Sequence, residues 1–441
     1  MTKLKSFLFA ASALVLLGIS ACKDPSDGTG GNSADTSTPR YTVSFAVEGG
    51  NGTLKAEVDG REIASGASVE QGKTVTFTAE PVPGCEVERW TNNGTVIGKA
   101  GKRRSWKHTV TADTDIKVEF QASFVEGGAS LIVSPDKLDI KVKTTTADGS
   151  SVRIEGCAET TLTSGAETVL HAKGTLVIFK GNIKKLDFSG WFSSDYSNKL
   201  IALNVQGLAA LQELFCYKTQ LVKLNVQGCS ALKLLSCYEN LLTELNVQGL
   251  TGLRTLECGR NKLTALDVQG LNALQWLACT SNQLTELNVQ GLNALQHLSC
   301  GGNQLTELNV QGLTVLQKLY CWGNQLTALN VQGLTALKEL YCHNNQFTVL
   351  NVQGLPALQR LSCRGNQFNS DVFIKLFNDL PVRADSDHAW CYLYTEKSGF
   401  TEGNHTDFTA PADLAAAFNK AKTEKKWKMY KHDESGNAVE I

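Results

Sequence analysis

Cysteine is the residue type whose number and spacing could carry chemistry in this chain. The sequence has 441 residues and 13 cysteines. Eight of the cysteines follow one another at intervals of 21 residues, and they are Cys216, Cys237, Cys258, Cys279, Cys300, Cys321, Cys342 and Cys363. Stacked strands lie about 4.8 Å apart with parallel side chains, whereas a disulfide needs Cβ atoms about 3.8 Å apart on converging vectors. Neither CxxC nor HxxxH, two common metal-ligand spacings, occurs. We therefore predict a column of unpaired core thiols and no metal site.

A second candidate for chemistry lies near the C-terminus, where His388 precedes Cys391 and Asp385 and Asp387 stand close by. A thiol nucleophile needs a base within hydrogen-bond reach and an acid that orients the base. Residues three apart on a strand lie on opposite faces, so this arrangement does not suit catalysis. We predict no catalytic residues, no enzymatic activity and no cofactor.

The regular cysteine spacing requires a repeating element, and the 21-residue period lies within the range of leucine-rich repeats. In the unit from Leu295 to Val315, Leu298 and Cys300 share one face of a short strand and are expected to point inward. Their neighbours His297, Ser299 and Gly301 then point outward. The return path is too short for a helix of two turns, so we expect an extended or 3₁₀ convex side.

An asparagine stands three residues after nearly every cysteine of the column. A buried amide at this turn can hydrogen-bond the backbone of neighbouring coils. The first unit has Thr219 instead, so we expect that coil to be looser. The column comprises Asn240, Asn261, Asn282, Asn303, Asn324, Asn345 and Asn366.

The period, the cysteine column and the asparagine column together resemble the cysteine-ladder leucine-rich repeats of internalin J and related bacterial surface proteins. The match covers residues 186–369. Further upstream, Gly84–Trp90 and Thr111–Val118 resemble the divergent B-repeat modules found beside such repeats in internalins. The resemblance implies an adhesin whose concave face binds host proteins or glycans.

The chain is thus predicted to be a mostly β solenoid of 21-residue leucine-rich repeats, preceded by a small all-β domain and closed by an α/β C-terminal cap. In the cap, helices are expected at 371–380 and 411–427, around a strand at 389–394. The expected segments are a signal peptide (1–21), a flexible tether (22–39), a B-repeat-like β domain (40–122), a β N-terminal cap (123–185), the repeats (186–369) and the C-terminal cap (370–441).

The N-terminus carries the features of a bacterial export signal. Two lysines precede an apolar run from Phe7 to Ile19, which is too short to span a bilayer in the mature chain. The following Ser20-Ala21-Cys22 resembles a lipobox, which implies a lipid on Cys22. The alternative is an ordinary signal peptide with an unmodified cysteine. We expect a monomer on the outer face of a bacterial outer membrane, held to the membrane through its lipid only.

Binding residues are sought where the repeats differ, because the convex Asn-Val-Gln-Gly is nearly constant while outward strand positions vary. Aromatic and cationic residues gather in the C-terminal repeats, and such side chains are common in binding hot spots. Alternatively, the rings simply fit a pleated strand surface or are covered by the C-terminal segment. The candidate ligand-binding residues are Trp276, His297, Lys318, Tyr320, Trp322, Tyr341, His343, Arg360 and Arg364.

The charge balance restricts the class of partner. The 42 Lys and Arg residues nearly equal the 43 Asp and Glu residues, which argues against nucleic-acid binding. The expected partner is a protein on a host or neighbouring cell; a mucin-type glycan or an envelope scaffold role without a dedicated ligand are the alternatives. One basic run, Lys102–His108, could contact anionic lipid or glycan or could be a solvated hairpin loop.

Overall fold

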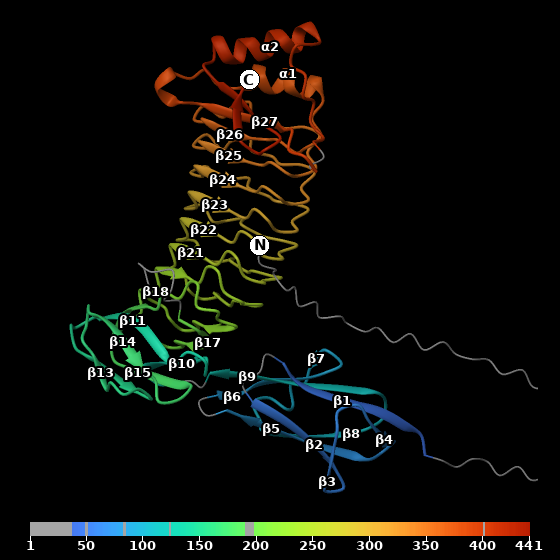
Figure 1. The fold of residues 1–441 in the computed structure, drawn as a ribbon, viewed down its shortest axis with the longest axis vertical. Coiled ribbons are helices and arrows are strands. Elements are labelled where there is room, and N and C mark those ends of the chain that lie inside the picture. The colour runs from blue at the N-terminus through green and yellow to red at the C-terminus, as the bar shows by residue number, and fades with distance from the viewer. Residues whose placement is uncertain (1–37, 49–51, 83–84, 123–124, 190–197, 400–401) are drawn as a thin grey trace, which may run out of the picture.

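The computed structural model describes residues 38–441, except 49–51, 83–84, 123–124, 190–197 and 400–401. The predicted signal peptide, Cys22 and nearly all of the tether lie outside the described residues. A small β module and a column of stacked coils follow one another along the long axis, and two helices close the far end of the column (Figure 1). No helix in the described ranges is long and apolar enough to cross a membrane.

The β module consists of nine strands between Arg40 and Ala122 in the described residues. Its strands alternate buried and exposed residues, so each sheet turns one face toward a shared core that includes the fully buried Phe77, Trp90 and Phe120. The two sheets have the strand orders β4-β1-β9-β6-β7 and β3-β2-β5-β8. The strands are β1 (Arg40–Glu48), β2 (Gly52–Val58), β3 (Arg61–Ile63), β4 (Ala67–Glu70), β5 (Thr74–Pro81), β6 (Cys85–Asn92), β7 (Thr95–Val96), β8 (Ser105–Thr109) and β9 (Thr114–Ala122).

Antiparallel strands lead from the module into the coils. The boundary expected at residue 186 falls inside β16, which pairs with β11 on one side and with the first repeat strand on the other. The segment therefore joins the repeat sheet directly. These strands are β10 (Gly128–Val133), β11 (Asp139–Thr146), β12 (Val152–Glu155), β13 (Thr161–Leu162), β14 (Glu167–His171), β15 (Leu176–Lys180), β16 (Ile183–Asp187) and β17 (Leu200–Asn204). Within the first coils, β19 (Lys223–Asn225) pairs with β17 in parallel.

The coils stack with a register of 21 residues. Leu277 pairs with Leu298, and Leu298 pairs with Leu319, in parallel strands. These leucines and the cysteines two residues after them are completely buried. The return path consists of turns and extended backbone in the described residues, and Gly312 takes a positive φ of 84° at one of its bends. The repeat strands are β18 (Glu213–Phe215), β20 (Leu234–Ser236), β21 (Thr255–Glu257), β22 (Trp276–Ala278), β23 (His297–Ser299), β24 (Lys318–Tyr320), β25 (Glu339–Tyr341) and β26 (Arg360–Ser362).

The asparagine column connects each coil to its neighbours. Asn303 donates from Nδ2 to the carbonyls of Cys279 (3.1 Å) and Cys300 (2.9 Å), and its Oδ1 accepts the amide of Leu284 (3.1 Å). At the first coil, the side chain of Thr219 bonds its own coil and the next one. Thr219 is 1% exposed, and its hydroxyl donates to the carbonyl of Cys216 at 2.7 Å while its amide donates to Oδ1 of Asn240.

A second amide column on the convex side explains the near-constant Asn-Val-Gln-Gly. Nε2 of Gln290 donates to the carbonyl of Asn309 in the next coil at 2.8 Å, and Gln311 repeats the bond to Asn330 at 2.7 Å. Within a coil, the Asn309 side chain accepts the amide of Gln311 at 3.1 Å. Each convex turn is thus hydrogen-bonded both within its own coil and to the next coil. Because these bonds recur from coil to coil, the repeated sequence stabilises this side.

The C-terminal segment extends the repeat sheet as well as closing the column. Strands β27 and β28 continue it in parallel, and β29 adds an antiparallel edge. Asn404 continues the asparagine column, because its Nδ2 donates to the carbonyls of Cys363 and Leu393, both at 2.9 Å. The elements are α1 (Ser370–Asp379), the 3₁₀ turn η1 (Asp385–Asp387), β27 (Trp390–Thr395), α2 (Ala412–Thr423), β28 (Lys428–His432) and β29 (Ala438–Glu440).

Candidate ligand-binding face

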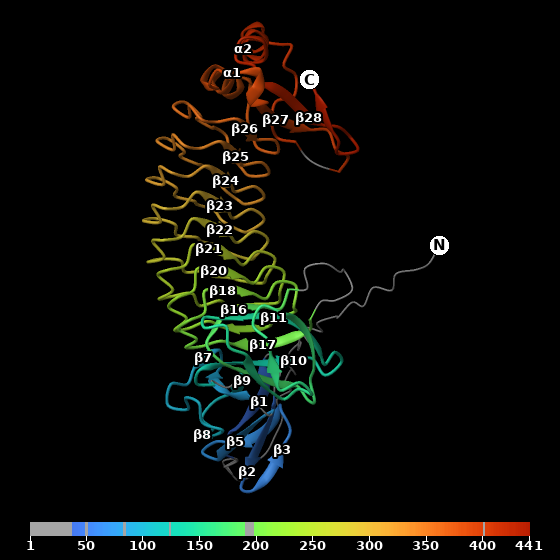
Figure 2. The same ribbon diagram turned by 90° about the vertical axis from the view of Figure 1, so that its left-hand side faces the viewer.

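A continuous row of aromatic rings runs along the outer face of the parallel sheet, from β22 to β28. We call it the aromatic lane, and it consists of Trp276, His297, Tyr320, Tyr341, Trp390, Tyr392 and Tyr430. Successive ring centroids lie 3.7, 5.1, 4.4, 5.6, 4.9 and 5.3 Å apart. The strands that carry the rings follow each other up the column in Figure 2. Side chains on this face cannot enter the core, because the inward positions are already filled by leucine and cysteine.

The row begins with a close stack of Trp276 on His297, whose ring planes are inclined by only 4°. Trp276 is 39% exposed, while His297 beneath it is 6% exposed. Burial, assisted by the charge of Lys318, lowers the pKa of His297 to about 4, so this ring is neutral at physiological pH. His297 was predicted to point outward; it lies on the outer face but is covered by its neighbours.

Glu339 holds the middle of the lane together and neutralises the cations beside it. Its carboxylate accepts a hydrogen bond from the hydroxyl of Tyr320 and pairs with Lys318 (3.1 Å) and Arg360 (2.9 Å). Burial alone would raise the pKa of Glu339, but these three partners hold it below its ordinary value. Lys318 and Arg360 are therefore part of an internal ion network rather than free positive charges.

Trp322 and His343 form a separate pair in the neighbouring column of the sheet. Their rings are parallel within 6° at a centroid distance of 5.8 Å. Trp322 lies over Gly301, where an added Cβ would come within 2.5 Å of the indole. His343 has its pKa lowered to about 3 by burial and by the nearby charge of Arg364. The absence of a side chain at Gly301 is what allows Trp322 to lie flat.

The structure places all nine predicted binding residues on this face but divides them into groups. Four of them belong to the lane, and the two cations Lys318 and Arg360 flank it by pairing with Glu339. Trp322 and His343 form a stack of their own. Arg364 hydrogen-bonds Ser362 at 3.1 Å. The sequence reasoning missed Glu339 and the three rings from the C-terminal segment. Trp390 pairs with Arg360, 30 residues earlier, because α1 is inserted between their strands and breaks the period. The tripeptide Trp390-Cys391-Tyr392 could have indicated a further strand of this sheet, because it places a cysteine between two outward aromatic residues as Tyr320 and Trp322 flank Cys321.

The second candidate for chemistry does not form a site. Cys391 is completely buried, and His388 is an exposed residue at the end of η1. The 12 cysteines in the described part of the chain are all free and buried. Burial raises the pKa of Cys279 to about 12 and that of Cys85 to about 11, which keeps both protonated and unreactive.

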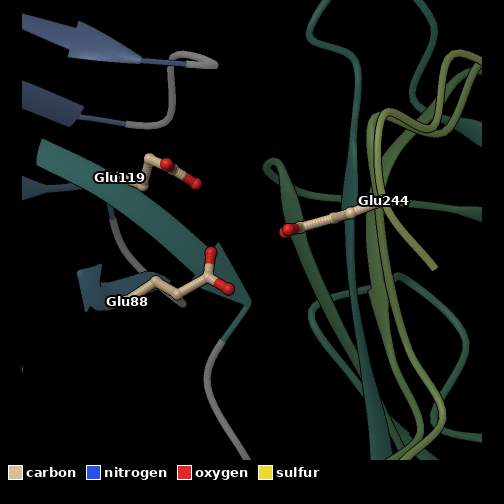
Figure 3. Close-up of side chains that lie close together, drawn as sticks. All are labelled: Glu88, Glu119 and Glu244. Atoms are coloured by element: carbon tan, nitrogen blue, oxygen red, sulfur yellow. The ribbon is translucent and has the colours of Figure 1, made fainter. Parts of the chain in front are cut away.

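Three carboxylates meet where the β module contacts the first coils: Glu88 and Glu119 of the module face Glu244 of a coil (Figure 3). Two cations lie among them. Lys223 pairs with Glu88 and, at 3.0 Å, with Glu119, while Arg89 pairs with Glu119 at 2.7 Å and with Glu244 at 3.5 Å. The cluster is therefore an ion network that connects the module to the coils.

Comparison with known proteins gives matches for both parts of the chain. Residues 41–124 match the divergent InlB B-repeat domain family, whereas no curated protein matches. A leucine-rich-repeat protein of Leptospira interrogans is 30% identical, with 39% of this chain and 48% of that chain covered and a TM-score of 0.38. The functional domain of InlJ from Listeria monocytogenes, which includes a cysteine ladder, is 25% identical over 51% of this chain and 52% of that chain, with a TM-score of 0.37.

The internalin InlF of Listeria monocytogenes is 22% identical, with 47% of this chain and 66% of that chain covered and a TM-score of 0.38. The chain thus spans about half the length of the first two structures. Its structural neighbours are internalins and other leucine-rich-repeat proteins, and its residues 41–124 are similar to the divergent InlB B-repeat domain.

Proposed function

We propose that this chain is a lipid-anchored adhesin on the surface of a diderm bacterium. Its leucine-rich-repeat solenoid binds a protein on a host or neighbouring cell through the aromatic lane. The β module acts as a stalk between the lipid on Cys22 and the repeats, and the protein has no enzymatic activity.

The aromatic lane is the single observation that carries this proposal. It crosses seven strands, and at about 4.8 Å per strand spacing it is about 29 Å long, which matches the dimensions of a protein interface better than those of a short sugar. Rings of this kind contribute large contact areas at low cost in side-chain entropy. Stacking and the Glu339 network hold them in place before a ligand arrives, which favours affinity.

Glycan binding is the second candidate, and the exposure of Trp276 favours it. This residue is 39% exposed and its indole lies parallel to His297, so one flat ring face is held against that imidazole. A sugar ring can stack on the opposite face of such an indole. This mode would need one or two rings, whereas a protein ligand would use the full length of the lane.

The test is binding of the mature chain, with Cys22→Ser, to an array of extracellular-matrix proteins and mucin glycans. The variant Trp276→Ala/Tyr341→Ala removes two lane rings. The control Tyr217→Ala/Tyr238→Ala removes two rings from the same face outside the lane. We expect the lane variant to lose binding at least tenfold, which corresponds to the loss of hot-spot side chains, while the control binds normally. Equal binding by wild type and lane variant would refute the proposal.

The compartment is tested separately by adding protease to intact cells. An adhesin predicts that the repeats are removed from the cell surface while periplasmic markers survive. Protection of the repeats would favour the envelope-scaffold alternative. Loss of membrane association in a Cys22→Ala chain, without loss of folding, would support lipidation independently of ligand binding.

A further inference from the structure

The basic run that stood out in the sequence forms an edge of the β module. Strand β8 is the last strand of the sheet β3-β2-β5-β8. It pairs only with β5 among the described strands, and Lys107 lies opposite Thr76 while Trp106 lies opposite Phe77. The cross-strand neighbours of this edge are therefore uncharged.

The backbone that carries the run is held firmly. The carbonyl of Arg103 accepts the indole N–H of Trp90 at 2.8 Å, and the carbonyl of Arg104 accepts the amide of Ala79 at 2.7 Å. Trp106 stacks on Phe77 at a centroid distance of 6.2 Å. The run is thus an ordered edge of the sheet, and its cations are presented from a fixed backbone.

Four cations of this edge, Lys99, Arg103, Arg104 and Lys107, are exposed and form no ion pair within the described residues. Lys102 of the same run does pair with Glu86, at 2.7 Å, and elsewhere in the module Arg40, Lys55 and Lys73 pair with Glu70, Glu80 and Asp59 at 2.8 to 3.0 Å. Since the whole chain has a formal net charge of −1, the positive charge on this edge is a local feature that favours an anionic partner.

The edge ends close to the point where the chain enters the module. The carbonyl of Pro39 accepts the amide of Gln71, and the carbonyl of Val110, directly after β8, accepts the amide of the adjacent Gly72. The 17 Cα–Cα steps from Cys22 to Pro39 span at most about 60 Å even when the chain is fully extended. If Cys22 carries a lipid, Pro39 stays within that distance of the bilayer, and Arg103, seven residues before Val110 along β8, lies at most about 25 Å further away.

We propose that this basic edge, formed by Lys99, Arg103, Arg104 and Lys107, is a second membrane contact that binds the phosphate headgroups of anionic lipids. This inference rests on the lipid anchoring in the proposed function. The lipid supplies membrane attachment, and the basic edge orients the module against the surface. Arginine suits this role because its guanidinium forms two parallel hydrogen bonds to a phosphate.

The test is co-sedimentation of the mature chain, with Cys22→Ser to remove the lipid, with vesicles of phosphatidylcholine alone or with about 30 mol % phosphatidylglycerol. The variant Arg103→Gln/Arg104→Gln/Lys107→Gln removes three charges. The matched control Lys233→Gln/Arg254→Gln/Lys338→Gln removes three exposed cations from the coils. Circular dichroism and the melting temperature establish that both variants fold.

We expect binding to the anionic vesicles only, weakened by raising the salt to about 0.5 M. Each cation near an anionic surface changes affinity about fivefold, so the triple variant should bind on the order of 100-fold more weakly. The control should bind like the parent chain. The proposal is overturned if the edge variant retains full binding, if the control loses as much, or if the chain binds soluble anionic glycan but not vesicles. This assay contains neither the lipid on Cys22 nor an adhesion ligand. A negative result therefore does not bear on the adhesin proposal.

Discussion

Replacing Asn303 by alanine tests the asparagine column at one rung. The substitution leaves the amide of Leu284 buried without a partner, because Oδ1 of Asn303 is its acceptor. The carbonyls that lose a bond each keep another: Cys279 retains Asn282, and Cys300 retains Asn324. Gly301, which accepts only a long bond of 3.4 Å from Asn303, retains the amide of Ser281. An orphaned buried N–H costs about 1 to 3 kcal/mol and each lost hydrogen bond about 1 kcal/mol. The free energy of unfolding should therefore fall by about 3 to 5 kcal/mol.

The assay is urea unfolding followed by far-UV circular dichroism, with amide exchange at Leu284 as a local readout. The control is Gln311→Ala, which removes an exposed bond of the convex column, to Asn330 at 2.7 Å, and a longer one to Gln332 at 3.4 Å. Water can replace the exposed bond and the second is long, so the expected loss is below about 1 kcal/mol. If Asn303→Ala loses no more stability than Gln311→Ala, or if the Leu284 amide stays protected, the reasoning fails.

Three further predictions concern the thiols, pH and the module junction. In denaturant without reductant, 12 thiols should titrate, leaving Cys22 as a thioether; a near absence of free thiols would contradict the stacked-thiol interpretation. Because the folded pKa of His297 is about 4 against an ordinary 6.5, the unfolded state gains a proton first as pH falls. The free energy of unfolding should therefore drop between pH 7 and 5, and His297→Gln should reduce this loss by about 2 kcal/mol in urea titrations. The same dependence of unfolding free energy on pH in the variant and the wild type would contradict this prediction. Lys223→Ala should destabilise the module by about 2 kcal/mol, because Glu88 and Glu119 then repel each other without the lysine between them. The control Lys262→Ala should unfold at the wild-type denaturant concentration. Equal unfolding midpoints for the two variants would reject the junction network.

Much of the architecture can be predicted from the sequence because every repeat has the same pattern of leucine, cysteine and asparagine positions. The leucine and cysteine positions can be assigned to the inner face since their spacing repeats without interruption from Cys216 to Cys363. The same regularity hides the role of Gln311, whose bond to the next coil becomes visible only when coils are stacked. The bond from the amide of Thr219 to Asn240 of the next coil likewise becomes visible only in the stacked coils.

The binding face could be predicted only in part. Strand positions identify which residues point outward, but not which of them contact each other. Glu339 was read as one varying position, although it connects Tyr320, Lys318 and Arg360. Trp390 escaped notice because the helical insertion before it shifts the spacing, so no period marks it as part of the sheet.

The most direct test of the central claim is to locate the ligand on the folded chain by site-specific photo-crosslinking. The photoreactive residue p-benzoylphenylalanine is placed at Trp276 in the lane or, as control, at Val349, which is 61% exposed on the return path. With a ligand identified on the array, we expect crosslinks from position 276 and none from position 349. Crosslinking from position 349 with none from position 276 would contradict that claim.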